Sequence, residues 1–244
     1  MSTLVVTDAK IYLAQYDISG DLNQVSIKQT PVLLEDTAFG GTYHTSKAGL
    51  KRAEIHAEGY TQFGSGVTTI DGRLQSKFAV ADTPVLVSPD GGDVGEVAYF
   101  MKSTMSTLNR GPVTVGELLK FQFDAVNSGA KGALVRGTLM EDGKTSRTSA
   151  SNTATQTLGA VSATQRLFAS LHLHTFSGTD VTFTVKSAVT DFGTITQRAA
   201  FTQNTAVGSE FITPVDGAIT DTFWRIYWTG TFTSFSAVVA IGIQ

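Results

Sequence analysis

The chain has 244 residues, enough for one large domain or two small ones to bury a hydrophobic core without disulfide bonds. It has no cysteine, which excludes disulfides, thiolate metal sites and cysteine nucleophiles. The formal net charge of −3 argues against a protein that holds duplex DNA on a basic surface. No basic segment followed by an apolar run opens the sequence, and no stretch approaches the roughly 20 apolar residues of a membrane span, so we expect no signal peptide and no membrane partner. Only 16% of the residues are charged, and a surface of hydroxyls and small side chains suits contact with copies of the same chain.

Apolar and polar residues alternate with a period of two along much of the chain, which predicts a mainly β protein. In the first clear strand Ala53, Ile55 and Ala57 alternate with polar residues that include Glu54 and Glu58. The other strands predicted in this way cover 119–125, 167–173, 181–185, 224–228 and 235–243. The turn at 177–180 predicts that 167–173 and 181–185 form a hairpin. The last strand is apolar on both faces, so we expect it to be central or covered on both sides.

One short helix is expected at about 94–105. Apolar residues there recur at helical spacing, and Asp93 with Glu96 would form a capping box. Residues 146–160 are rich in Ser and Thr and have almost no large apolar side chain, so they are interpreted as a linker or loop. The predicted organisation is a domain at 1–145 and a second β-sandwich domain or lobe at 161–244.

Few residues suggest chemistry. His172 and His174 point to the same side of a predicted strand and could share a metal ion, but no third ligand follows at a suitable spacing, so two polar residues on a solvated or inter-subunit face are favoured. No nucleophile elbow, P-loop or dinucleotide fingerprint is present. The Asp90–Asp93 turn lacks the alternating oxygen ligands of a calcium loop. We therefore expect no catalytic, cofactor-binding or metal-binding residue, and no enzyme.

The segment from Ile18 to Tyr60 carries a specific series of short motifs. They are DISG at 17–20, DTAFG at 36–40, GLK at 49–51 after Thr45, and EGY at 58–60. In this order and spacing they resemble the N-terminal region of phage major tail proteins, also called tail tube proteins. The stretch from Gly95 to Met140 is similar to these proteins too, and the C-terminal part resembles the strand-rich endings of related phage structural proteins less specifically.

The resemblance implies a tail-tube-type β-sandwich with one short helix, in a virion protein that assembles into stacked rings in the host cytoplasm. An arm at 31–51 would reach the next subunit through Phe39, Tyr43 and Leu50. The lumen would carry genomic DNA without specific binding, and a basic lumen would slow DNA passage. The acidic candidates for lumen-facing residues are Glu35, Asp36, Glu54 and Glu58. The implied partners are copies of the chain, three or six to a ring, and the tape measure, tail terminator and tail tip proteins.

Two alternatives remain open from the sequence. The chain could be another virion component, such as a head decoration or tail-tip protein. It could also be a host-recognition module that binds carbohydrate through Trp224, Tyr227 or Trp228, which requires these aromatic side chains to be exposed.

Overall fold

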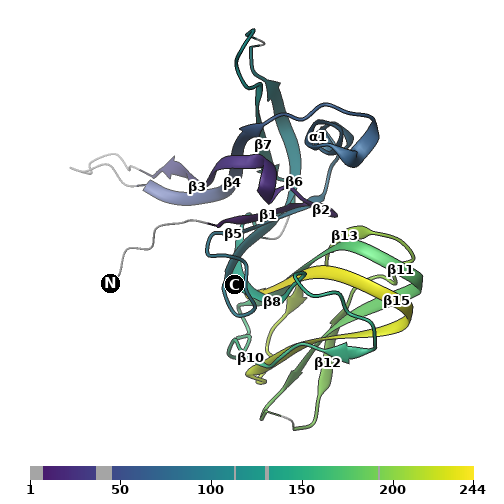
Figure 1. Cartoon of the computed structure of the whole chain (residues 1–244). Coiled ribbons are helices and arrows are strands. Elements are labelled where there is room, and N and C mark those ends of the chain that lie inside the picture. Colours follow the sequence, from purple (N-terminus) through teal and green to yellow (C-terminus); the bar gives the residue numbers. More distant parts are fainter. Residues whose placement is uncertain (1–7, 37–45, 113, 130–131, 192) are drawn as a thin grey trace. The chain divides into compact units, whose positions relative to one another are not determined.

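A computed structural model describes residues 8–36, 46–112, 114–129, 132–191 and 193–244 (Figure 1). The protein is mainly β with one short α-helix, and its strands pair antiparallel in strongly curled sheets. The chain forms two compact units. Unit 1 comprises Met1–Gly20, Asp82–Lys102 and Val135–Gln244, and unit 2 comprises Asp21–Ala81 and Ser103–Leu134.

Unit 2 contains a four-stranded antiparallel sheet. Its strands, in spatial order, are β3 (Leu22–Glu35), β4 (Ser46–Tyr60), β7 (Lys120–Asn127) and the second part of β6 (Val97–Arg110). On β4 the predicted alternation is confirmed, because Ala53, Ile55 and Ala57 are fully buried while the polar residues between them are partly exposed. One face of this sheet is therefore a core face and the other is polar.

The α-helix of unit 2, α1 (Ile70–Lys77), is short and follows the 3₁₀ turn η2 (Gly66–Thr68). Ile70 and Leu74, one helical turn apart, bury their side chains. Arg110 on β6 fixes the helix, since its Nε donates to Asp71 Oδ1 at 2.6 Å and its Nη2 to Gln75 Oε1 at 2.9 Å. No helix among the described residues is long and apolar enough to cross a membrane.

The predicted helix at 94–105 is wrong, since this segment lies mostly in strand β6. Ala98 and Phe100 are buried in one alternating frame, whereas Met101, Ser103 and Met105 are buried in the other. Because the buried positions shift by one residue at Met101, the apolar residues of this strand are spaced as they would be on one face of a helix. Glu96 does accept a hydrogen bond from the Asp93 N–H (2.8 Å), as in a capping box, but the bond closes a turn before the strand.

Unit 1 is built on a curled antiparallel path of strands. Along the sheet the order is β12, β11, β15, β8, β6, β5, β1, β2. Their bounds are Thr196–Ala200, Arg166–Ala188, Phe223–Ile243, Val135–Asp142, the first part of β6, Thr83–Ser88, Lys10–Leu13 and Tyr16–Asp17. A 3₁₀ turn, η1 (Ser19–Asp21), follows β2, and four short strands pair off this path: β9 (Ser151–Asn152), β10 (Gln156–Thr157), β13 (Gly208–Phe211) and β14 (Val215–Asp216).

The predicted hairpin between 167–173 and 181–185 is wrong, because both segments belong to the single long strand β11, which pairs with β15 along its whole length. Irregular register at Ser177–Asp180 bends the paired strands. Gly178 is required at this bend, since a Cβ there would lie 2.4 Å from Phe232 Cα. Leu171 before the bend and Phe183 after it therefore reach the same core.

The C-terminal half of β15 is central, as predicted. It pairs with β11 on one edge and β8 on the other. Val239 and Ile241 belong to one buried cluster, and Val238 and Ala240 to another, so both faces of the strand are covered. The continuous apolar run at the end of the sequence results from this position.

The Ser/Thr-rich segment 146–160 is not an unpaired linker between the two units. It contributes β9 and β10, which pair with β15 inside unit 1. The compact units also differ from the predicted 1–145 and 161–244 domains, because unit 2 consists of two segments, each inserted between segments of unit 1. Sequence composition marks an exposed, polar segment here, but it carries no information about which strand that segment pairs with.

Candidate functional site

The most distinctive surface of unit 2 is the polar face of its sheet. Three of its residues lie directly opposite one another, with Ser26 on β3 facing His56 on β4, which faces Asp124 on β7. Lys28 lies opposite Glu54 in the same ladder. Because directly opposite residues share a face of the sheet, these side chains form one polar surface, called the polar face below.

His56 lies between two carboxylates of the polar face. Its Nδ1 lies 2.6 Å from Asp124 Oδ1 and its Nε2 lies 3.0 Å from Glu58 Oε1. The hydrogen bond to Asp124, followed by the one to Glu58, raises the pKa of His56, and partial burial opposes this shift. When protonated, the imidazolium donates to both carboxylates and neutralises part of their charge.

The four predicted lumen-facing acids fall into two places. Glu54 and Glu58 share the polar face, which agrees with the alternation seen in the sequence. Glu35 lies opposite Ser46 at the far end of β3 and β4, and Asp36 forms an ion pair with Lys47 there. Glu54 follows Ser46 by eight positions along β4, a distance of about 26 Å along an extended strand. The acid that the sequence analysis missed is Asp124, whose place in the alternating run 119–125 was the available signal.

The second feature of unit 2 is the outer end of the β3–β4 hairpin, residues 31–36 and 46–51, called the outer arm below. It projects from the sheet as a two-stranded ribbon (Figure 1). Its residues are exposed on both faces of the ribbon except for the half-buried Gly49. Val32, Leu33, Leu34 and Leu50 expose between 51% and 84% of their surface, with Leu50 the most exposed. Phe39 and Tyr43, predicted to act with Leu50, lie outside the described residues.

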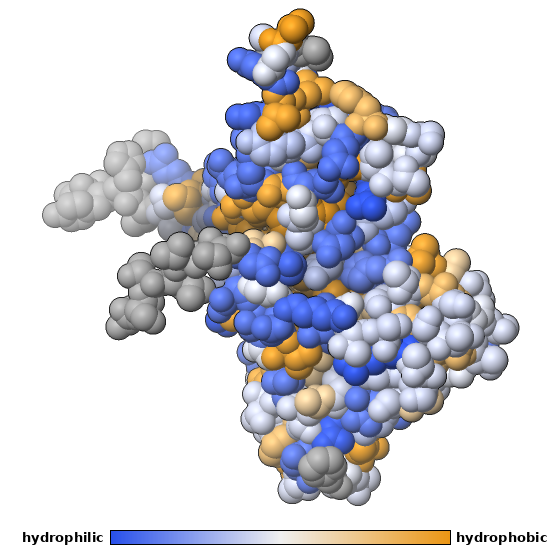
Figure 2. Space-filling view, viewed as in Figure 1, coloured by the Kyte–Doolittle hydropathy of each residue, from blue (hydrophilic) through white to orange (hydrophobic). Residues whose placement is uncertain are grey.

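The outer arm has no third strand beside it within the part of the chain that the structure describes, where β3 pairs only with β4. A two-stranded ribbon is marginally stable in water, and exposed aliphatic side chains add an unfavourable contact with solvent. Hydrophobic side chains also gather at the end of the β6–β7 hairpin, where Val115 and Leu118 are exposed (Figure 2). These surfaces suit contact with another protein chain.

The two tryptophans do not form a carbohydrate platform. Trp224 and Trp228 are 0% and 2% exposed. Their indole N–H groups donate to the carbonyl oxygens of Gly159 and Ser149, both at 2.9 Å. Burial of Trp224 and Trp228 therefore excludes carbohydrate binding through these two side chains. Tyr227, which alternates with them along the strand, points to the other face of β15.

His172 and His174 are not the solvated pair that the sequence suggested. His172 is fully buried, with Nδ1 2.6 Å from the Ala14 carbonyl and Nε2 2.9 Å from Ser170 Oγ. Burial lowers the pKa of His172 to about 3, so the ring is neutral. His174 Nδ1 lies 3.0 Å from the Gln15 carbonyl. Both imidazoles thus attach β11 to the β1–β2 turn, and no group of three potential metal ligands occurs among the described residues.

Comparisons with known proteins find likeness only at the level of solved structures. No family model matches the sequence, and no curated protein matches it either. A chain in the structure of the SPP1 Dit protein, described as a hub adsorption apparatus in phages that infect Gram-positive bacteria, is 11% identical, with a TM-score of 0.37 over 98% of this chain and 100% of that one. A chain of an extracellular contractile injection system sheath–tube complex is 10% identical, with a TM-score of 0.43 over 56% of this chain and 92% of that one. A chain of a gene transfer agent virion is 15% identical, with a TM-score of 0.37 over 48% of this chain and 91% of that one. At these low TM-scores the likeness carries no functional argument.

Proposed function

We propose that this chain is a structural protein of a phage virion, which assembles with copies of itself into stacked rings of the tail tube, the conduit for DNA delivery. The observation that carries the proposal is the outer arm, a two-stranded ribbon with four exposed aliphatic side chains. The resemblance of residues 17–60 to tail tube proteins supports it independently, because that segment includes both strands of the arm.

In this proposal the sheet of unit 2 joins the sheets of neighbouring copies into one wall. Among the described residues β3 pairs only with β4, so it is an edge strand of this sheet, and a closed ring removes such edges. The polar face would then line the lumen. Its carboxylates, Glu54, Glu58 and Asp124, are balanced by nearby cations rather than outnumbered by them, so duplex DNA would pass without being held.

The outer arm would contact the next subunit or ring through Leu50 and its aliphatic neighbours, with Phe39 and Tyr43 as the remaining proposed contacts. The neighbours of such a tube would be the tape measure, tail terminator and tail tip proteins. The protein would be non-enzymatic, and it would assemble in the host cytoplasm before it becomes part of the virion.

Electron microscopy and sedimentation velocity of the purified chain test this function. We expect hollow rods or stacked rings at high concentration. Single rings that never stack would favour a tail-tip component, and monomers at every salt concentration would contradict self-assembly.

Substitutions in the outer arm test the contact itself. The double variant Leu33→Thr, Leu50→Thr keeps residues of strand propensity, and both positions are already exposed, so unfolding should be unchanged while assembly is lost. The matched control Val189→Thr, Val207→Thr replaces two exposed aliphatic residues of unit 1 and should assemble as the wild type does. Normal assembly of the arm variant would contradict the proposed role of the arm.

A further inference from the structure

A second apolar surface of unit 2 lies at the end of the β6–β7 hairpin, residues 114–119, called the hairpin tip below (Figure 2). The tip contains a turn that is closed by a hydrogen bond of 3.1 Å from the Glu117 N–H to the Thr114 carbonyl. Val115 is fully exposed there, and Leu118 exposes 74% of its surface. Two aliphatic side chains therefore project into solvent from a hydrogen-bonded turn.

The base of the hairpin tip is joined to the end of β4. The Thr61 N–H donates to the Leu119 carbonyl at 2.8 Å, directly after Tyr60 pairs with Lys120. The outer arm lies at the other end of β4, where Leu50 precedes Tyr60 by ten positions, about 33 Å along an extended strand. One copy therefore carries two apolar surfaces at opposite ends of the same strand, and they do not cover each other.

The charges beside these two surfaces are opposite. On the outer arm Lys51 follows Leu50, and on the hairpin tip Glu117 precedes Leu118. Both charged side chains are exposed, and neither forms an ion pair with another residue that the structure describes. Charges beside an apolar contact determine which surfaces pair, because like charges brought together are unfavourable. A two-fold contact between two arms through Leu50 would bring two copies of Lys51 together, whereas a contact between arm and tip pairs Lys51 with Glu117.

We propose that the outer arm of one copy docks on the hairpin tip of the next copy. The aliphatic residues of the arm would pack against Val115 and Leu118, and Lys51 would pair with Glu117. This inference rests on the proposed function, because it names the surface that receives the arm. Each copy would use one surface to reach its neighbour and a different surface to receive the next copy, so the contact is head-to-tail. Such a contact closes a ring or extends a stack, whereas a two-fold contact between arms ends at a dimer.

A variant of the hairpin tip tests this pairing in the full chain. Val115→Thr, Leu118→Thr, called the tip variant, should lose assembly as completely as the arm variant Leu33→Thr, Leu50→Thr. Its thermal unfolding should match that of the wild type, because both side chains are already exposed. Sedimentation velocity measures the assembled fraction.

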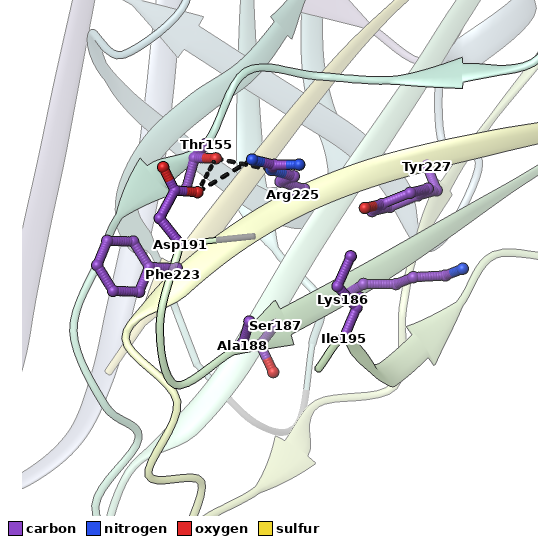
Figure 3. Close-up of a pocket in the computed structure, with 9 residues that line it drawn as sticks. All are labelled: Thr155, Lys186, Ser187, Ala188, Asp191, Ile195, Phe223, Arg225 and Tyr227. Atoms are coloured by element: carbon purple, nitrogen blue, oxygen red, sulfur yellow. Dashed lines mark hydrogen bonds and ion pairs between the residues drawn. The ribbon is translucent and has the colours of Figure 1, made fainter. Parts of the chain in front are cut away.

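The matched control for the tip variant lies in unit 1. Ile195 and Val207 are 42% and 44% exposed. Ile195 lines a shallow pocket beside Lys186, away from unit 2 in the sequence and in the division of the chain (Figure 3). Ile195→Thr, Val207→Thr removes the same kind of exposed aliphatic surface and should assemble as the wild type does.

Mixing the two defective variants distinguishes a head-to-tail contact from a contact between like surfaces. The tip variant retains its arm, and the arm variant retains its tip. An equal mixture should therefore form complexes that contain both chains and grow no further, because the remaining arm and the remaining tip are both defective. Sedimentation velocity and mass spectrometry, with one of the chains isotope-labelled, measure these mixed complexes.

A zero-length carbodiimide crosslinker tests the contact in the wild type without any substitution. It joins an amine to a carboxylate in direct contact, so assembled wild type should give an amide between Lys51 and Glu117. Lys51 precedes Tyr60, where the hairpin joins β4, by nine positions, about 30 Å along the strand, so this amide must join two copies. A mixture of isotope-labelled and unlabelled chains should accordingly give crosslinked peptides of mixed label.

The proposal is overturned if the tip variant assembles normally, if the mixture gives no mixed complex, or if assembled wild type gives no amide between Lys51 and Glu117. Normal assembly of the tip variant, beside hollow rods of the wild type, would leave the proposed function standing. A wild type that stays monomeric would instead remove the proposed function together with this contact.

Discussion

The ion pair between Arg147 and Glu141 holds a buried carboxylate in unit 1. Glu141 is 1% exposed, and the guanidinium of Arg147 donates to both of its carboxylate oxygens at 2.8–3.0 Å. Burial raises the pKa of Glu141, and Arg147 opposes that shift. Arg147 also lies over the Trp228 ring at 5.4 Å. The carboxylate can remain ionised in the core only because this one cation neutralises it.

Replacement of Arg147 should therefore lower the free energy of unfolding by more than the loss of an exposed ion pair does. We expect Arg147→Ala to lose about 3 kcal/mol of unfolding free energy, since it leaves a buried carboxylate without its partner. Arg166→Ala, which breaks an ion pair with Asp216 whose side chains are both more than two-fifths exposed, should lose less than about 1 kcal/mol. Urea unfolding at neutral pH measures both. Equal losses would show that the Glu141 site is as well solvated as the surface pair.

The raised pKa of His56 makes the stability of unit 2 depend on pH. A group with a folded pKa above its unfolded value of about 6.5 contributes stability that is complete below that value and is lost as pH rises through the folded pKa. The stability advantage of the wild type over His56→Gln should thus be larger at about pH 5.5 than at about pH 9. Both proteins carry the same other titrating groups, so the difference between their urea midpoints at each pH isolates the contribution of His56. An advantage that does not change with pH would mean that the imidazolium gains nothing from Asp124 and Glu58.

At the level of single elements, strands in which buried and exposed residues alternate regularly can be predicted from the sequence. Elements without such a regular alternation are missed. The alternation on β4 and the coverage of both faces of β15 could be predicted, because burial follows the pleat directly. Strand β6 was mistaken for a helix because its buried residues change frame at Met101. Helix α1 was missed because only Ile70 and Leu74 signal it, over eight residues that include Gly72.

Pairing between distant segments lies beyond such local patterns. The bend at Gly178 could be mistaken for a hairpin turn, because the register between β11 and β15 is set by residues some 50 positions away. The polar face shows the same limit. Glu54, Glu58 and Asp124 are each identifiable as polar residues on a strand, but only the β4–β7 ladder brings Asp124 to His56.

The bend in β11 can be tested through Gly178. A Cβ at this position would meet Phe232 Cα at 2.4 Å and the Thr231 carbonyl oxygen at 2.7 Å, both of them backbone atoms that cannot rotate away. Gly178→Ala should therefore lose about 1–3 kcal/mol of unfolding free energy, as in other overpacked sites. Gly20→Ala, with nothing within 4 Å of the added Cβ, should change stability by less than about 0.5 kcal/mol. A neutral Gly178→Ala variant would show that the paired strands can separate at the bend without cost.

At the scale of the whole molecule, the low charge of the chain determines which force can drive its assembly. Basic and acidic residues number 18 and 21, so long-range repulsion between copies is weak, and the outer arm offers aliphatic rather than charged contacts. Exposed ion pairs are screened within about 10 Å at 0.1 M salt, whereas apolar burial is not. Raising sodium chloride from about 0.05 to 0.5 M should thus leave the assembled fraction nearly unchanged. Sulfate should increase this fraction and cooling should decrease it, because apolar burial strengthens with excluded salts and weakens at low temperature. Sedimentation velocity measures the fraction directly, and dissociation in sodium chloride would show that charged contacts hold the subunits together.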